Sequence, residues 1–91
     1  MFLCNDPWVG AAHQNDVAVY APLFIDGDLF AWSGTTIHQV DVGGPNPGSF
    51  TIAAQDVFGE GSPIPPIKIM RQGELQHDVE DMYIRLSLIH I

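Results

Sequence analysis

Basic residues are scarce in this chain: Lys and Arg total three, Asp and Glu total eleven, and the formal net charge is -8 at pH 7. Proteins that bind nucleic acids or anionic membrane surfaces use Lys and Arg to neutralise the phosphates of their partners. The shortage of these residues therefore argues against both kinds of partner. An acidic surplus keeps a surface soluble and is also compatible with binding a divalent cation.

Cysteine and long apolar runs are also rare. Cys4 is the one cysteine, so the chain forms no internal disulfide, which fits a reducing compartment. Its place in the apolar run Met1–Cys4 favours a buried structural thiol over a catalytic one. No apolar stretch approaches the ~20 residues of a membrane-spanning helix, and no charged segment followed by a long apolar one is present. We therefore expect a soluble, cytoplasmic protein.

Several common catalytic and nucleotide-binding motifs are missing. The sequence contains no GxGxxG, no Walker-type GxxxxGK, no HExxH and no GxSxG. Gly43-Gly44 is a poor anion site, because no Lys lies nearby and no helix start follows it. These absences direct attention to the His and Asp residues.

The residues that are present predict a small, mostly β fragment of the α+β class. The 91 residues, 46% of them apolar, make one small domain at most. Segments of about 17–25 and 28–38 form a central β-hairpin, because Asp26-Gly27 between them suits a type I′ turn. Gly/Pro-rich loops follow, and a helix of about 74–85 ends the predicted elements.

The other segments are assigned from their local patterns. Phe2–Cys4 resembles the end of a strand, and Thr51–Phe58 fits either a strand or a short helix. Ile64–Met70 is predicted to be extended, since a residue that precedes proline is kept out of the α region. The C-terminal helix is predicted from apolar residues at helical spacing between Leu75 and Tyr83.

Two polar clusters flank the predicted hairpin and suggest a metal site. A turn at residues 26 and 27 folds residue n roughly against residue 53 − n, so Asp16 faces Ile37 and His13 faces Val40. His38 then lies beside both predicted ligands. Two imidazoles and a carboxylate are a common ligand set for Zn, Mn or Fe(II). The alternative is that His13, Asp16 and His38 are ordinary polar residues of turns and strands.

Three further residues are weighed for chemistry. Asp41 is close enough to accept a hydrogen bond from a ligating imidazole. Glu60, between two glycines, is a candidate catalytic carboxylate, although a loop-surface carboxylate is the simpler interpretation. His77 falls on the polar face of the predicted helix, where we expect a solvated residue.

An ordered series of motifs resembles the hydantoinase B/oxoprolinase family, and it covers nearly all of residues 2 to 85. The motifs are Asn5-Asp6-Pro7-Trp8-Val9-Gly10, His13-Gln14-Asn15-Asp16-Val17, Phe24-Ile25-Asp26-Gly27-Asp28-Leu29, His38-Gln39-Val40-Asp41-Val42-Gly43-Gly44, Pro47-Gly48-Ser49, Asp56-Val57-Phe58-Gly59-Glu60-Gly61 and Ile64-Pro65-Pro66-Ile67-Lys68. Many members have Gly-Gly-Thr where this chain has Gly10-Ala11-Ala12. Gln39 likewise replaces a histidine that many members carry after the His that matches His38.

The resemblance implies an enzyme subunit whose hydantoinase A-type partner binds ATP, in a hetero-oligomer. Members open cyclic amides such as hydantoins and 5-oxoproline, or carboxylate ketones such as acetone and acetophenone. In the ketone carboxylases the matching subunit holds Mn or Fe through a His-x-x-Asp pair and a later His, which match His13, Asp16 and His38. The first expectation is therefore a metal-binding subunit acting on cyclic amides. A ketone carboxylase subunit, or a non-catalytic subunit-contact region, is the alternative.

The two ends of the sequence suggest a fragment. Residues 1–85 are expected to be a piece of the N-terminal region of a much longer subunit. The last six residues, 86–91, match the translated transposon end sequence used in shotgun library preparation, so we exclude them from functional reasoning. We expect the isolated 91-residue chain to be inactive, because it lacks the ATP-binding partner.

Overall fold

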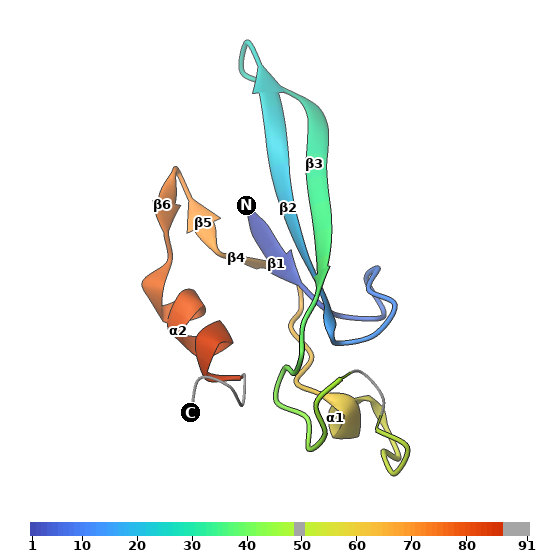
Figure 1. The fold of residues 1–91 in the computed structure, drawn as a ribbon. Helices are drawn as coiled ribbons and strands as arrows, with labels where there is room; N and C mark the ends of the chain where they lie inside the picture. The colour runs from blue at the N-terminus through green and yellow to red at the C-terminus, as the bar shows by residue number, and fades with distance from the viewer. Residues whose placement is uncertain (49–50, 87–91) are drawn as a thin grey trace.

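A computed structural model describes residues 1–48 and 51–86, so Ser49 of the family motifs and residues 87–91 of the expected library-derived segment lie outside the described residues. Within these described residues, six strands and two helices follow one another (Figure 1). They are β1 (Phe2–Cys4), β2 (Asp16–Ile25), β3 (Asp28–His38), α1 (Val57–Glu60), β4 (Ile67–Lys68), β5 (Met70–Arg71), β6 (Glu74–Leu75) and α2 (His77–Arg85). The predicted α+β class, with mostly β structure, is confirmed.

The main sheet is antiparallel, with strand order β3-β2-β1-β4, and β5 and β6 form a second, two-stranded sheet. The long β2–β3 hairpin extends well beyond β1, as Figure 1 shows. Its turn has positive φ angles at Asp26 (49°) and Gly27 (84°), as a type I′ turn requires. The predicted hairpin is therefore confirmed at both strands and at the turn.

The predicted hairpin register is wrong by one residue. Ile25 pairs with Asp28 next to the turn, as predicted, but a β-bulge between Leu23 and Phe24 shifts the pairing beyond it. Phe30 is the extra residue, because Phe24 pairs with Leu29 whereas Leu23 pairs with Ala31. The shift carries through the remaining ladder to its far end.

The predicted start of the C-terminal helix is also wrong. Residues 74 and 75 pair with β5 instead, and α2 begins at His77. The cause is a tight turn at Gln72-Gly73, where both φ angles are positive (52° and 78°) and the chain reverses into β6. None of the helices in the described part of the chain is long and apolar enough to cross a membrane.

Two segments with alternative predictions are now assigned. Thr51–Phe58 contains no strand; helix α1 begins at its end, and the Asp56 side chain caps it by accepting a hydrogen bond from the Gly59 N–H at 3.0 Å. Ile67 and Lys68 form the edge strand β4, which pairs with β1. Phe2–Cys4, predicted as the end of a strand, and the extended segment Ile64–Met70 thus pair with each other through β1 and β4.

The small core lies where the hairpin joins the rest of the chain. Leu3, Val17 and Val42 form its buried centre, and Tyr83 of α2 packs against them. Cys4 is buried beside this cluster, as expected from its apolar neighbours. Val17, a residue of this core, directly follows Asp16, the first residue of β2.

Candidate metal centre

The end of the hairpin ladder brings the predicted ligands together. Asp16, the first residue of β2, pairs directly with His38, the last residue of β3. His13 lies one turn earlier, and its carbonyl accepts a hydrogen bond from the Asp16 N–H at 3.1 Å. The bulge at Phe30 is what places His38, rather than Ile37, opposite Asp16.

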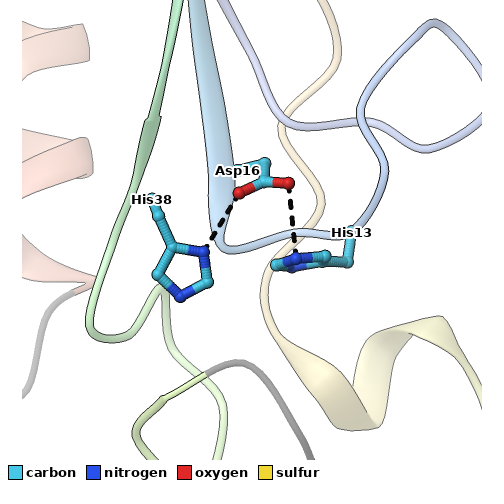
Figure 2. A group of neighbouring side chains, drawn as sticks. All are labelled: His13, Asp16 and His38. Atoms are coloured by element: carbon cyan, nitrogen blue, oxygen red, sulfur yellow. Dashed lines mark hydrogen bonds and ion pairs between the residues drawn. The ribbon is translucent and has the colours of Figure 1, made fainter.

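The Asp16 carboxylate lies between the two imidazoles, as Figure 2 shows. His13 Nε2 is 3.3 Å from Asp16 Oδ2, and His38 Nδ1 is 3.1 Å from Asp16 Oδ1. The two rings meet edge to face with their centroids 5.3 Å apart. The His13 and Asp16 side chains are 31% and 22% exposed and that of His38 is 50% exposed, so the group opens to solvent on the His38 side.

The donor set fits a divalent cation. One ligand atom from each of the three residues lies within 4.8 Å of the other two. Metal–ligand bonds of roughly 2.1 Å place neighbouring ligand atoms roughly 3 Å apart, so the observed separations need little adjustment. Within residues 1–48 and 51–86 this is the one group of three or more His, Cys, Asp or Glu with such spacing. Metal binding itself stays a prediction.

The other predicted residues are not among these three. Asp41 is 4% exposed and lies three residues after His38; its contact with a ligating imidazole stays a prediction. Glu60 ends α1 and is not part of the group. Its carbonyl lies 2.3 Å from where a Cβ on Gly44 would be, so α1 packs tightly on the Gly-rich loop. His77 is 81% exposed and pairs with Glu80 at 3.1 Å, so it is a solvated residue, as expected.

Three buried amide side chains next to the ligands were not predicted. Asn5 is 0% exposed; its Nδ2 donates to the Gln14 and Ser62 carbonyls, at 3.0 Å each, and its Oδ1 accepts from the Ile64 N–H. Asn5 thereby joins the end of β1 to the segment that carries His13 and Asp16, called the ligand loop below, and to the chain before β4. The sequence offered one sign of these buried amides, the pair Gln14 and Asn15 between His13 and Asp16. Such a pair is also typical of an ordinary turn.

Gln14 and Asn15 occupy the two positions between His13 and Asp16. They are 1% and 4% exposed. The Gln14 Nε2 donates to the Val57 carbonyl at 3.1 Å and so ties the loop to α1. The ligand loop is therefore anchored by Gln14 and Asn15, while the predicted ligands His13 and Asp16 stay partly exposed.

Two of the curated proteins that are similar to this chain are enzyme subunits. The caprolactamase subunit beta of Pseudomonas jessenii is 35% identical over 80 residues, which cover 88% of this chain and 14% of that subunit. The acetophenone carboxylase delta subunit of Aromatoleum aromaticum is 31% identical over 88 residues, which cover 97% of this chain and 13% of that subunit. The chain thus spans about a seventh of the length of these relatives.

Solved structures share the fold. The crystal structure of the ATP-dependent caprolactamase from Pseudomonas jessenii matches 96% of this chain and 15% of its own, with a TM-score of 0.87 and 32% identity. A nucleotide-free structure of acetone carboxylase matches 93% of this chain and 11% of its own, with a TM-score of 0.85 and 30% identity. The sequence model described as hydantoinase B/oxoprolinase matches residues 1–87. The chain therefore belongs to the hydantoinase B/oxoprolinase family.

Proposed function

We propose that this chain is the metal-binding part of a subunit in an ATP-dependent enzyme that opens cyclic amides. The observation that carries the proposal is the convergence of His13, Asp16 and His38 at the end of the hairpin ladder. The similarity to a caprolactamase subunit, whose name denotes a cyclic amide as substrate, supports the choice of reaction. In this proposal ATP binds to a hydantoinase A-type partner subunit, and the similarity to an ATP-dependent caprolactamase supports the use of ATP.

The residues of the site divide the work between charge and orientation. Asp16 contributes the negative charge, and each histidine offers one ring nitrogen on the side that faces Asp16. A divalent cation held there, Mn, Fe or Zn, supplies a Lewis acid toward a carbonyl oxygen. The exposed side of His38 leaves room for a small-molecule substrate. Asp41 accepts a hydrogen bond that fixes one imidazole, and Glu60, the last residue of α1, is a candidate catalytic carboxylate.

A ketone carboxylase is the second candidate. Similarity to the acetophenone carboxylase delta subunit extends over 97% of the chain, more than the 88% matched by the caprolactamase subunit. The two reactions are separated by assaying the full-length protein with its partner for substrate-stimulated ATP hydrolysis. Stimulation by a lactam or hydantoin without bicarbonate supports the amidase, and stimulation by a ketone that requires bicarbonate supports the carboxylase.

The metal centre is tested with His38→Ala in the full-length subunit. We expect the bound-metal content after dialysis to fall by at least about tenfold, because the site loses one of its three donors. Activity of the assembled enzyme falls with it. The matched control is His77→Ala, which also removes a histidine paired with a carboxylate, but on the solvated face of α2.

The outcomes separate a catalytic from a purely structural role. Metal content and activity that are unchanged in His38→Ala contradict the assignment and favour a non-catalytic, subunit-contact region. Loss of metal in both variants shows that the measurement does not report on this site. Loss in His38→Ala alone supports the proposed centre.

A further inference from the structure

The ladder of the hairpin ends beside the proposed ligands, and Asn15 lies at this end. Asp16 and His38 are the last residues paired between β2 and β3. One further main-chain bond follows, from the Gln39 N–H to the Asn15 carbonyl at 2.7 Å. Beyond it the two segments separate, one toward His13 and the other toward the Gly-rich loop.

The side chain of Asn15 continues the pairing where the main chain stops. Its Nδ2 donates to the Gln39 carbonyl at 2.9 Å and to the Val40 carbonyl at 3.2 Å. Asn15 therefore makes three hydrogen bonds to the two residues that directly follow His38. At 4% exposed it makes them away from water, where hydrogen bonds are stronger electrostatically.

The strand that carries His38 is largely exposed. Strand β3 contains no buried residue, and Ile37 and Val40, one residue before and two residues after His38, are 54% and 53% exposed. The His38 side chain is itself half exposed. Packing therefore contributes little to the position of this end of the strand, and its hydrogen bonds contribute most.

We infer that Asn15 is a positioning residue of the metal centre, which holds His38 at the correct distance from Asp16. This inference rests on the proposed metal-binding function. A metal site requires its ligands within about 0.5 Å of the productive geometry. The two bonds that the Asn15 side chain donates, with the main-chain bond that its carbonyl accepts, supply that constraint to the one ligand that comes from an exposed strand. His13 and Asp16, by contrast, share one turn of the chain.

Asn5 provides the matched control. It too is a buried asparagine whose Nδ2 donates to two carbonyls, those of Gln14 and Ser62. None of its described hydrogen bonds reaches the segment after His38. Replacing Asn5 therefore weakens the fold around the site without acting specifically on His38.

The test is a double-mutant cycle in the full-length protein, with Co²⁺ affinity measured by absorption titration. Asn15→Ala is expected to raise the Kd for Co²⁺ about tenfold or more when His38 is present. In the background of His38→Ala it should change the Kd less than about twofold, because the ligand that it positions is gone. Asn5→Ala should change the Kd by the same factor in both backgrounds. The visible spectrum of bound Co²⁺ in Asn15→Ala should approach that of His38→Ala, with one nitrogen ligand fewer.

Each outcome decides the inference. Equal factors for Asn15→Ala in the two backgrounds show a general effect on the fold and overturn the positioning role. A parent protein that binds no Co²⁺ overturns the proposed function and this inference with it. If Asn15→Ala does not fold, Asn15→Ser keeps one donor and should give an intermediate loss that again depends on His38.

Discussion

The two ends of the β2–β3 hairpin differ in which side chains are buried. Polar side chains are buried at one end, whereas large apolar side chains are exposed at the other. At the ligand end amide side chains are buried beside the apolar core, and Asn5 and Gln14 are 0% and 1% exposed. At the turn end the side chains are large and apolar, yet Phe24, Phe30 and Trp32 are 61%, 72% and 53% exposed. Burial in this chain therefore depends on the hydrogen-bonded junctions between segments as well as on hydrophobicity.

The cause lies in how far the third strand reaches. β1 pairs with β2 only from Ala18 to Tyr20, so the hairpin beyond that point is a two-stranded ribbon. The Phe2 and Trp32 rings, with centroids 6.0 Å apart, make an aromatic contact between β1 and the ribbon. A two-stranded ribbon has no third element to cover its faces, and such a ribbon is marginally stable by itself. The ligand end is held by the fold, whereas the turn end depends on its own ladder.

The largest effect on stability is expected from Asn5→Ala. This change leaves the Gln14 and Ser62 carbonyls and the Ile64 N–H buried without the partner they now have. We expect the free energy of unfolding, measured by urea denaturation, to fall by about 3 kcal/mol. The control is Asn46→Ala, which removes an exposed amide from the Gly/Pro-rich loop. Equal losses of unfolding free energy in the two variants would show that burying the Asn5 amide at the ligand end adds no stability.

Much of the fold is predictable because its signals are local. Asp26-Gly27 specifies the turn through the φ angles it accepts, and the β-branched and aromatic residues before it specify the strand. The bulge at Phe30 has no comparable signal, because any residue can occupy it. Because the bulge was not predicted, the predicted register is wrong by one residue beyond it. Asp16 pairs with His38 instead of with the predicted Ile37.

The site is predictable only in its ligands. The residue types and the hairpin spacing pick out His13, Asp16 and His38, and the structure brings them together. The buried amides are not predictable from the same pattern, because their burial depends on distant residues. Asn5, for example, is enclosed through contacts with Ser62 and Ile64, more than fifty positions later. Asn and Gln between ligands look like ordinary turn residues until those segments are in place.

A smaller effect on stability is expected from pH. It reports on Tyr83, which packs against the core near the ligand end. Burial raises the pKa of the Tyr83 phenol above its usual value of about 10. The folded state therefore favours the protonated phenol, and this contribution to stability is complete below pH 10 and lost as pH rises through the folded-state pKa. We expect the free energy of unfolding to decline above pH 10 more steeply in the parent chain than in Tyr83→Phe. Identical declines would show that the phenol titrates in the same way in both states.

The smallest effect on stability is expected at the turn end, from Phe30→Ser. This change replaces the aromatic side chain of the bulge residue, which is 72% exposed. Its ring has little burial to lose, so the free energy of unfolding of the 91-residue chain should change by less than about 0.5 kcal/mol. Urea denaturation under the conditions used for Asn5→Ala measures it. A loss above about 1 kcal/mol would mean that the ribbon folds back onto the body of the chain in solution. The large apolar residues at the turn would then be part of the core, and the contrast with the ligand end would not hold.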